Sequence, residues 1–399
     1  MRVLHAASSY PLGPGDTTAP FMEEMLGALA NRGHRVSVVV PRVKGLLEGA
    51  RNGVEVQGAG YAPQRFQQWG YGRSLTSDGS LRAVAALVTP FALTSMGRVL
   101  RSNIKTEKPD VVHLHWVLPQ GLLAVVVPRS LPLVVSIHGA DVAFSRGLLR
   151  NIARGVLARA DAVVAASTGV LSAVADIHPG IESKSHVIPH GANDLLLRGR
   201  SSSQARRRLG LVPEEAIILA VGRLVPKKGF ETLIRSMVHL GPAGPRLFII
   251  GEGLDRARLE AAIPTEMTDR IHLIGSRSRG DLADWYAASD VVVVPSVPTG
   301  GDVDSGPVVL MEAMAAGRAV VATRIGMAPD LIETGVNGVL LDSIGEDEVA
   351  KAIDVALRSA EPFGRAARET FERVGGWTRV AEDLETVYRK VMIEPPVKR

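Results

Sequence analysis

Short apolar segments alternate with longer segments of helical periodicity along most of the chain. Between residues 20 and 31, for example, apolar side chains recur at the spacing of one helix face, and Gly33 follows as a signal for the helix to end. The segments between such helices are almost entirely apolar, which is typical of parallel strands buried on both faces of a sheet. In the first half of the chain the predicted strands are residues 3–6, 35–40, 111–114, 133–137, 162–166 and 186–188.

A polar segment separates this pattern from a second one of the same kind. Residues 195–210 are rich in arginine and serine, and we interpret them as a linker and a short helix capped by Ser203. The alternation then resumes, and the predicted helices are residues 230–240, 255–262, 281–289, 307–316 and 378–391. The predicted strands of this half are residues 217–221, 246–250, 271–274, 291–294 and 319–322.

The fold class that follows is α/β, with two Rossmann-like domains of parallel strands and covering helices. We place the first domain at residues 1–195 and the second at residues 196–376. Ligands of such sheets bind beyond the carboxyl ends of the strands, so two linked domains can face one central cleft. The loops at those strand ends are therefore the places where chemistry is expected.

Composition narrows the kinds of chemistry that these loops can perform. The 399 residues include no cysteine, which excludes a disulfide scaffold, a thiolate nucleophile and cysteine-ligated zinc or iron–sulfur sites. The N-terminus leads directly into a predicted strand, without the apolar core of a signal peptide. The uncharged stretch at residues 83–97 is too short and too polar to cross a bilayer. We therefore expect a cytoplasmic protein that is soluble or peripheral to a membrane.

The first loop, residues 9–18, carries Gly13, Gly15 and Asp16 between a strand and a helix. Its glycines allow the backbone to approach a ligand, and the following helix offers its N-terminus to an anion. The same glycines are also compatible with ordinary turn geometry. The loop does not match a dinucleotide fingerprint, because Thr18 stands where the third glycine belongs. A nicotinamide-dependent enzyme is therefore not predicted.

Histidines lie in and after two predicted strands of the first half. His138 follows the strand at residues 133–137, where it can donate a hydrogen bond to an oxyanion or a sugar hydroxyl, or instead cap the following turn. His113 and His115 lie at a strand, and we expect one side chain to enter each helix layer as a hydrogen-bonded core residue.

The loop after the strand at residues 217–221 is strongly basic. Gly222 allows close approach, and Arg223 and Lys228 place two cations beside the start of a helix. A guanidinium, an ammonium and a helix dipole together suit a diphosphate group. The alternative is a solvated basic turn, which the position at a strand end disfavours.

The loop after the strand at residues 291–294 ends in a predicted helix start. Gly306 and Pro307 begin the helix, with proline in the first turn where its missing N–H costs least. Backbone amides of Ser305, Val308 and Val309 around this start can hold a phosphate.

Carboxylates lie on both sides of that helix start. Asp302 and Asp304 precede it, and Glu312 follows within the helix, so two acids can each hold vicinal hydroxyls of a bound ligand. Glu312 paired with a nearby arginine is the alternative interpretation. Asp302 and Asp304 have the spacing of the Asp-x-Asp metal-binding motif. No metal site is expected, because the cations of the basic loop already supply positive charge.

These motifs together resemble the retaining, nucleotide-sugar-dependent glycosyltransferases of family 4, or glycosyl transferases group 1, which have the GT-B fold. The resemblance covers nearly the whole chain. Its most specific parts are the Gly-Arg and Lys-Gly motif within residues 221–230 and the Pro-Val-Val-Leu-Met-Glu-Ala-Met-Ala-Ala-Gly motif at residues 307–317. Supporting motifs are the first loop and residues 31–38, 137–141, 187–193 and 250–253.

The resemblance implies roles for the residues of the second half. Arg223 and Lys228 would hold the donor diphosphate, and Glu312 the ribose hydroxyls. Asp304 stands where the family has a glutamate that binds the donor sugar. The side chain of aspartate is shorter by one methylene, so its carboxylate lies closer to the backbone. Asp302 can share the role of binding the sugar.

In the first half, the resemblance gives His138 the place of the family's histidine beside the transferred sugar. Gly15 and Asp16 match the family loop near the diphosphate and the acceptor. The helix at residues 377–394 would cross back onto the first domain. We take His138, Asp304, Arg223 and Lys228 as the candidate catalytic residues.

The implied reaction transfers a hexosyl group from a UDP- or GDP-sugar to an acceptor hydroxyl with retention of configuration, in glycan, polysaccharide or glycolipid biosynthesis. The nucleotide sugar is a co-substrate, so no cofactor is expected, and nucleic acid is not an expected partner. Two alternatives stay open: a sugar-nucleotide-binding scaffold without activity, and a sugar-nucleotide epimerase of the same fold.

The net charge of +5 is unevenly distributed. Residues 61–108 and 195–210 each carry a net charge of +5, so the rest of the chain carries −5. The first of these segments also contains the uncharged stretch at residues 83–97, from which we hypothesise contact with an anionic membrane surface, at the inner face of the membrane, or with a lipid-linked acceptor. A solvated basic face is the alternative.

Overall fold

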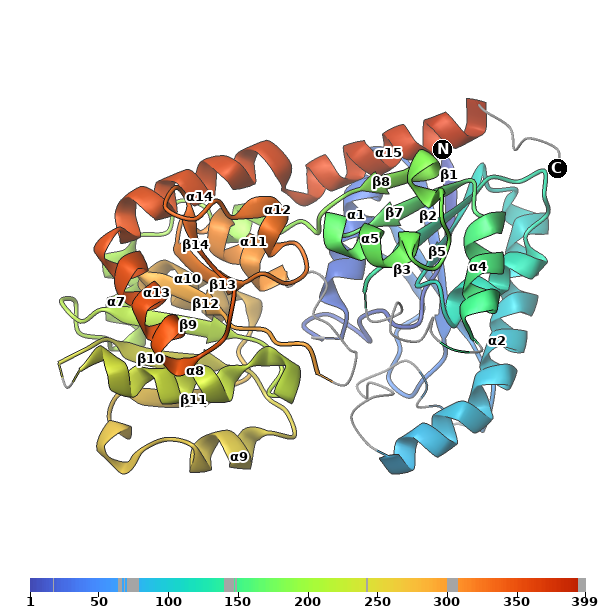
Figure 1. Ribbon diagram of the computed structural model, residues 1–399. Helices are drawn as coiled ribbons and strands as arrows, with labels where there is room; N and C mark the ends of the chain where they lie inside the picture. Colours follow the sequence, from blue (N-terminus) through green and yellow to red (C-terminus); the bar gives the residue numbers. More distant parts are fainter. Residues whose placement is uncertain are drawn as a thin grey trace. The chain divides into compact units, whose positions relative to one another are not determined.

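The computed structural model describes residues 1–16, 18–63, 67, 69, 79–139, 147, 149–241, 243–299 and 308–393, without the side chains of residues 79–86, 195 and 196. Within these ranges the chain forms two compact α/β units (Figure 1). The first unit contains residues 1–188 and the C-terminal helix α15 (Trp377–Ile393), and the second contains residues 189–376. Each is built on a sheet of mainly parallel strands, as the alternating pattern predicts.

The first unit contains an eight-stranded sheet with the order β3-β4-β2-β1-β5-β6-β7-β8. All neighbouring strands are parallel except β3 and β4, which are antiparallel. The strands are β1 (Arg2–Ala6), β2 (Arg35–Pro41), β3 (Gly49–Arg51), β4 (Val54–Ala59), β5 (Val111–His115), β6 (Leu133–Ile137), β7 (Ala162–Ala165) and β8 (Ser185–Val187).

Strands β3 and β4 are absent from the sequence-based prediction. In β4, buried Val54 and Val56 alternate with exposed Glu55 and Gln57. This alternation is the pattern of a strand that faces water on one side, and it differs from the continuous apolar runs of the inner strands on which the prediction rests.

Helices cover both faces of this sheet. One face packs against α1 (Pro20–Asn31) and α15, which share a single apolar core with alternate residues of β1, β2 and β5. The other face forms a second apolar core. It is covered by α2 (Gly79–Glu107), the 3-10 helix η2 (Gln120–Val126), α4 (Leu149–Arg159) and α5 (Thr168–Ala175). Among the described residues, no helix has both the length and the apolar character needed to span a membrane.

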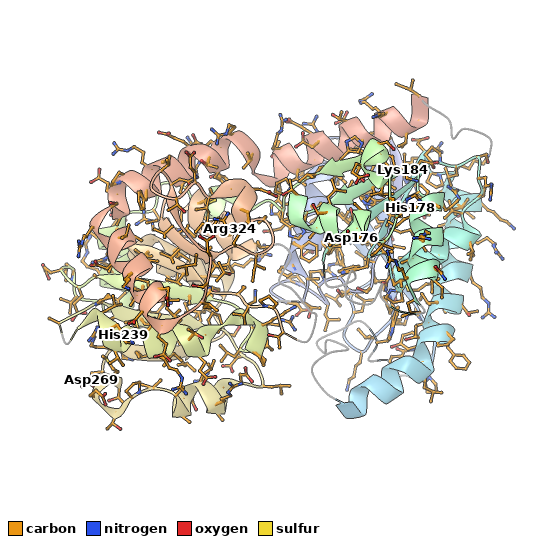
Figure 2. The ribbon with its side chains drawn as sticks, viewed as in Figure 1. Asp176, His178, Lys184, His239, Asp269 and Arg324 are labelled. Atoms are coloured by element: carbon orange, nitrogen blue, oxygen red, sulfur yellow. The ribbon has the colours of Figure 1, made fainter. Side chains whose placement is uncertain are left out.

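Lys184, labelled in Figure 2, caps the C-terminal end of α4. It ends the 3-10 turn η3 (Ile181–Lys184), and its ammonium donates hydrogen bonds to the carbonyl oxygens of Leu157 and Ala160 at 2.9 and 2.7 Å. Burial lowers the pKa of Lys184, whereas carbonyl groups at a helix C-terminus favour a cation. This contact ties the segment that enters β8 to the helix before β7.

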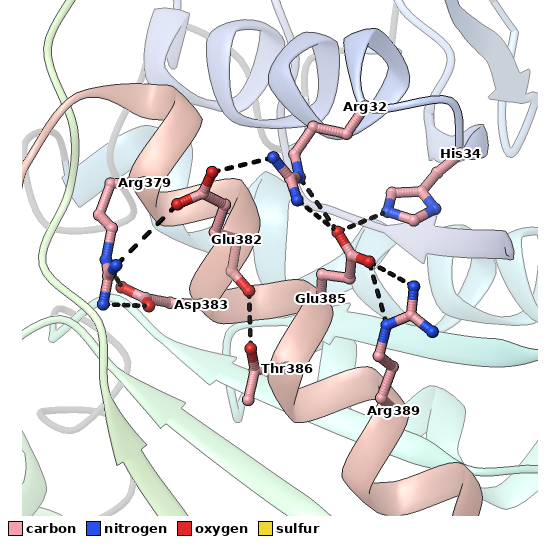
Figure 3. A network of polar contacts seen from close by, with 8 residues as sticks. All are labelled: Arg32, His34, Arg379, Glu382, Asp383, Glu385, Thr386 and Arg389. Atoms are coloured by element: carbon pink, nitrogen blue, oxygen red, sulfur yellow. Dashed lines mark hydrogen bonds and ion pairs between the residues drawn. The ribbon is translucent and has the colours of Figure 1, made fainter.

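Polar contacts between the C-terminal end of α1 and the middle of α15, shown in Figure 3, fix the two helices to each other. The guanidinium of Arg32 donates to Glu382 at 3.0 Å and to Glu385 at 2.9 Å. Arg389 donates to the other oxygen of Glu385 at 2.6 Å. The hydrogen bonds from Arg389 and Arg32 lower the pKa of Glu385 to about 2, which shows that this carboxylate is strongly stabilised in its ionised form.

The second unit contains a six-stranded, fully parallel sheet with the order β11-β10-β9-β12-β13-β14. Its strands are β9 (Ile217–Val221), β10 (Arg246–Ile250), β11 (Ile271–Gly275), β12 (Val291–Val294), β13 (Ala319–Thr323) and β14 (Gly338–Leu341). The first five coincide closely with the predicted segments. The short edge strand β14 is absent from the prediction.

Helices also cover both faces of the second sheet, and an apolar core lies on each side. One core includes residues of α6 (Asp194–Leu197), α7 (Ser202–Leu209), α10 (Arg279–Ala288), α11 (Val308–Ala315), α12 (Ala328–Leu331) and α14 (Ala360–Val374). The other includes residues of α8 (Phe230–Ser236), η5 (Met237–Leu240), α9 (Arg256–Ala261), η6 (Thr265–Met267) and α13 (Glu346–Arg358).

The boundary between the units lies before residue 189, earlier than the boundary after residue 195 that the sequence suggests. Two contacts explain the difference. Ala192 forms a parallel bridge with Gly376, and Asp194 pairs with Arg368 of α14. These contacts join the connecting segment to the second unit.

The basic segment at residues 195–210 is largely engaged with acids of its own unit. Arg206 is buried and donates to both oxygens of Asp290 at 2.9 and 2.8 Å. Arg200 and Arg208 both pair with Asp284 of α10. Much of this local charge is therefore part of the fold of the second unit.

The cap of α7 is Ser201, and the expectation that Ser203 caps it is wrong. Ser201 has an extended backbone, and its hydroxyl accepts a hydrogen bond from the amide of Gln204 at 3.4 Å. The helix already begins at Ser202, so Ser203 lies inside its first turn.

The Glu385 contacts predict a pH-dependent contribution to stability. Because the pKa in the folded protein is lower than the 4.5 of the free group, ionised Glu385 stabilises the fold fully above about pH 4.5 and progressively less as the pH falls toward 2. Glu385→Gln should therefore lower the free energy of unfolding by about 1 kcal/mol at pH 7. Urea unfolding of both proteins between pH 7 and pH 3 measures this difference, which should shrink below pH 4.5. A constant difference at every pH would contradict the assignment to ionised Glu385, and Glu369→Gln, at an exposed position of α14, is the control.

Candidate functional site

The basic loop after β9 is held against the loop after β10 by backbone hydrogen bonds. The amide of Gly222 donates to Ile250 at 2.9 Å, and the amide of Leu224 donates to Glu252 at 3.0 Å. A Cβ atom added at Gly251 would lie 1.8 Å from the carbonyl oxygen of Gly222. The Gly-Glu-Gly motif at residues 251–253 is therefore required by the close approach of two backbones at the carboxyl edge of the sheet.

The basic loop also contacts the loop after β12. The amide of Val297 donates to the carbonyl oxygen of Lys227 at 2.8 Å. Gly229 has a φ of +67°, and a Cβ atom there would lie 1.9 Å from the carbonyl oxygen of Pro295. Since no other residue fits that space, Gly229 fixes the turn that leads from the 3-10 turn η4 (Pro226–Lys228) into α8.

The two candidate cations lie in this fixed loop. Arg223 is exposed, and Lys228 is half-buried. A Cβ atom on Gly222 would lie 3.3 Å from Cε of Lys228, so the aliphatic part of Lys228 passes over Gly222. The absence of a side chain at Gly222 thus makes room for the lysine beside the end of β9.

Glu312 lies on α11, the helix that follows β12, and its carboxylate is positioned by Tyr286. The hydroxyl of Tyr286 donates to Glu312 at 2.6 Å. Tyr286 is 1 % exposed on α10, and burial, followed by the charge of Glu312, raises its pKa well above the usual value. The phenol therefore stays protonated and acts as a hydrogen-bond donor at any physiological pH. Tyr286 is absent from the residues predicted from the sequence.

Several of the predicted residues of the loop before α11 lie outside the described residues. These are Asp302, Asp304, Ser305, Gly306 and Pro307. The described part of the helix begins at Val308 and falls within the predicted residues 307–316. The side chain of Val309 is partly buried and packs against the apolar core of the second unit.

In the first unit, Asp16 organises the loop between β1 and α1. Its two carboxylate oxygens accept hydrogen bonds from the amide of Leu12 at 2.7 Å and from the amide and hydroxyl of Thr18 at 3.2 and 3.1 Å. Gly15 is exposed and has a φ of +82°. The geometry gives Asp16 a role in shaping this loop, whatever the loop binds.

His138 lies directly after β6, among aromatic side chains. Its ring centroid is 4.8 Å from that of Trp116 and 5.3 Å from that of Phe21, at the start of α1. Its Nε2 is 3.2 Å from Nδ1 of His115. The structure thus brings His138 beside the beginning of the helix that follows the first loop.

The expectation that His113 and His115 enter opposite helix layers is wrong. Residues two apart on a strand share a face, and both side chains lie on the α15 side of β5, with ring centroids 4.3 Å apart. Their expected burial is confirmed, since both are fully buried. His5 of β1 joins them, with Nδ1 at 3.0 Å from Nε2 of His115. His5 is not recognisable as part of this group from the sequence, because a single histidine in an apolar strand carries no motif.

Comparison with known proteins identifies both halves of the chain. The model described as Glycosyltransferase Family 4 matches residues 19–194, and the model described as Glycosyl transferases group 1 matches residues 201–371. A D-inositol 3-phosphate glycosyltransferase of Xylanimonas cellulosilytica is 31% identical over 317 residues, which are 72% of this chain and 74% of the relative. An uncharacterised glycosyltransferase of Methanocaldococcus jannaschii is 29% identical over 306 residues, 72% of this chain and 76% of the relative.

Solved structures show the same fold. Sucrose-phosphate synthase from Thermosynechococcus elongatus has a TM-score of 0.79 at 20% identity and covers 99% of this chain and 100% of its own. Anabaena HepE in complex with UDP has a TM-score of 0.72 at 19% identity and covers 98% and 100%. With two family models that together match most of the chain, and a relative above 30% identity, the chain belongs to the group 1, family 4 glycosyltransferases of the GT-B fold.

Proposed function

We propose that this glycosyltransferase uses a UDP- or GDP-sugar as donor and transfers its hexosyl group to an acceptor hydroxyl with retention of configuration. The observation that carries the proposal is the geometry at the carboxyl edge of the second sheet. There the loop of Arg223 and Lys228 is fixed by backbone contacts, and the carboxylate of Glu312 is fixed by Tyr286. Solved neighbours with UDP, or with UDP and glucose, support a nucleotide-sugar donor.

The cations act on the leaving group in this proposal. As the bond between the sugar and the diphosphate breaks, negative charge grows on the diphosphate oxygens, and Arg223 and Lys228 stabilise it. An oxygen of the donor phosphate accepts the proton of the acceptor hydroxyl, whose oxygen forms the new bond on the same face of the sugar. The charge is balanced by side chains alone, so the reaction needs neither a cofactor nor a metal ion.

The remaining predicted residues complete the proposed donor site. Glu312 accepts hydrogen bonds from the ribose hydroxyls, and Asp304 holds the transferred sugar. Amides around the start of α11 hold the diphosphate. In the first unit, His138 serves the transferred sugar, and Gly15 and Asp16 serve the diphosphate and the acceptor. Such a transfer would be a step in the biosynthesis of a glycan, polysaccharide or glycolipid.

Substitution of Glu312 and Tyr286 tests the donor site. Glu312→Ala should weaken binding of the recognised nucleotide by about 10- to 100-fold, because a hydrogen bond to a charged group is lost. Tyr286→Phe keeps the ring in the core but removes the donor that orients Glu312, and should weaken binding by about 2- to 10-fold. Calorimetry with UDP and GDP side by side measures both effects, with Glu369→Ala as a control for removing an exposed acid from the same unit.

Failure of both nucleotides to bind the wild-type protein would show that the donor site is assigned wrongly. Product analysis separates the remaining alternatives. Release of free nucleotide that depends on an acceptor supports transfer, whereas an epimerised donor indicates an epimerase. Nucleotide binding without either product, in a broad screen of acceptors, indicates a scaffold without activity.

We also propose that helix α2 contacts an anionic membrane surface, where a lipid-linked acceptor would lie. Leu87 and Phe91 are 71 % and 62 % exposed, and they precede the exposed cations Arg98, Arg101 and Lys105 on the same helix. Residues 87, 91, 98 and 105 recur at the spacing of one helix face. Exposed apolar side chains next to basic ones suit the boundary between lipid headgroups and acyl chains.

Sedimentation with lipid vesicles tests this surface. The protein should bind phosphatidylglycerol vesicles more tightly than phosphatidylcholine vesicles, and binding should fall as the salt concentration rises. Changing Arg98, Arg101 and Lys105 together to glutamine should weaken binding on the order of 100-fold, at about 1 kcal/mol for each charge. The variant with Arg198→Gln and Arg207→Gln removes exposed charges from the second unit and should bind normally. Absent or salt-insensitive binding of the wild type would leave α2 as a solvated basic face.

A further inference from the structure

A cluster of polar side chains interrupts the apolar core between the first sheet and α15. His5 of β1, His113 and His115 of β5 and Ser136 of β6 lie on this face, and Tyr388 of α15 covers them. All five are buried, with at most 4 % exposure. Such a cluster in a core of valine, leucine and methionine side chains calls for a physical reason, because burying a polar group is costly unless it is paired.

The hydrogen bonds divide the cluster into two separate sets. His113 is saturated, with Nδ1 at 2.7 Å from the hydroxyl of Tyr388 and Nε2 at 2.7 Å from the hydroxyl of Ser136. His115 instead joins two other rings. Its Nε2 is 3.0 Å from Nδ1 of His5, and its Nδ1 is 3.2 Å from Nε2 of His138. The second set is therefore a chain of three imidazoles that runs from the buried core to His138, at the end of β6.

If all three rings are neutral, proton counting leaves two arrangements for this chain. Each neutral imidazole carries one N–H, and each hydrogen bond between two rings needs one donor nitrogen and one bare nitrogen. If His115 carries its proton on Nδ1, then His5 and His138 must also carry theirs on Nδ1. If His115 carries its proton on Nε2, all three rings carry it on Nε2. The tautomers of the three rings are thus tied together.

The buried end of the chain distinguishes the two arrangements. Nε2 of His5 has no hydrogen-bond partner among the described residues. Protons on Nε2 would leave an unpaired N–H in the core at this atom, whereas protons on Nδ1 leave only a bare nitrogen. In protein backbones, a buried N–H group without a hydrogen-bond partner is rarer than a buried acceptor without one. We expect the same preference for imidazole, which favours protons on Nδ1. Burial lowers the pKa of His5 to about 3, so this ring stays neutral at physiological pH.

The ring of His138 is also held from the side. Trp116, which follows His115, has a φ of +73°, a backbone conformation that is costly for a bulky side chain. Its amide donates to the carbonyl oxygen of Ser136 at 2.8 Å, and its own carbonyl oxygen accepts from Gly121 at 3.0 Å. These bonds fix the strained residue in place, with its ring against that of His138.

We propose that His115 and His5 are positioning residues that hold His138 in the tautomer with its proton on Nδ1. His138 then presents an N–H donor on Nδ1, while Nε2 is committed to His115. This inference rests on the proposed function only for the use of that donor, which is to bind a hydroxyl of the transferred sugar. The tautomer itself is a property of the nucleotide-free protein.

A metal site is the competing use of the same residues. One ring nitrogen from each of His5, His113 and His115 lies within 4.8 Å of the others, a spacing at which three histidines can hold an ion. However, both ring nitrogens of His113 are already bonded to hydroxyls. A metal would have to displace one of these bonds and the bond between His5 and His115, so the hydrogen-bonded chain explains the geometry better.

Nuclear magnetic resonance of the full-length, nucleotide-free protein tests the proposal. With ¹⁵N-labelled histidine, the ring nitrogen shifts of each histidine show which nitrogen carries the proton, and His138→Gln identifies the His138 signals. The wild type should show His138 with its proton on Nδ1. A proton on Nε2 of His138 in the wild type would overturn the proposal, and this measurement does not depend on any variant.

Three variants show whether His115 is responsible. His115→Phe cannot bond to His138 and should release it to a mixture of tautomers, whereas His115→Asn keeps a polar group near the position of Nδ1 and should preserve the wild-type form. His113→Phe makes the same change at the neighbouring saturated ring; it should reduce stability but leave the His138 tautomer unchanged. An unchanged His138 signal in His115→Phe, or a changed one in His113→Phe, would contradict the assignment.

Kinetics and metal binding provide independent measurements. His115→Phe should lower kcat by about tenfold, with nucleotide affinity unchanged because the donor nucleotide binds to the second unit, and His115→Asn should restore much of the rate. If instead the nucleotide fails to bind the wild type, the proposed function is wrong and the tautomer result still stands. Uptake of one equivalent of Zn²⁺ that is lost in both His113→Phe and His115→Phe would overturn the hydrogen-bonded chain in favour of a metal site.

Discussion

The parallel arrangement of the strands is the constraint on which the rest of this structure depends. Apart from β3, every strand runs parallel to its neighbours, so the loops that follow the strands of a sheet all emerge at the same edge. In the second unit this brings the loops after β9, β10 and β12 into contact through backbone hydrogen bonds. In the first unit it brings His138, after β6, close to the start of α1. Residues far apart in the sequence thus become neighbours without needing long side chains to reach one another.

Close contact between backbones then decides which residues those loops contain. Where one carbonyl oxygen would lie within 2 Å of a Cβ atom, as at Gly229 and Gly251, only glycine fits. The glycines of the two motifs therefore shape these loops, and charged side chains lie beside them. In the basic loop, glycine thus fixes the backbone that carries the cations Arg223 and Lys228.

How far the sequence predicts this structure depends on the kind of contact involved. Apolar strands and periodic helices are local signals, and β9, β10 and β12 begin and end where the sequence places them. Charged residues in the loops at strand ends and in the helices that follow are also visible, so Arg223, Lys228 and Glu312 can be proposed from their positions alone. Tyr286 and His5 are not predictable in this way, because their roles come from partners far along the chain, Glu312 and His115. The same limit applies to the basic segment at residues 195–210, where Arg200, Arg206 and Arg208 pair with acids that only the fold brings near.

The buried histidines show why a core would retain such residues despite their cost. Three fully buried imidazoles have six ring nitrogens, and within the described part of the chain only Nε2 of His5 lacks a hydrogen-bond partner. Hydrogen bonding offsets most of the desolvation, but valine or leucine at these positions would pack as well without that cost. Apolar side chains could not, however, transmit the position of a proton. Because each imidazole must be a donor on one side and an acceptor on the other, a chain of them fixes the tautomer of its outermost member. That property, which no apolar core can supply, is the physical reason for a polar cluster that ends at His138.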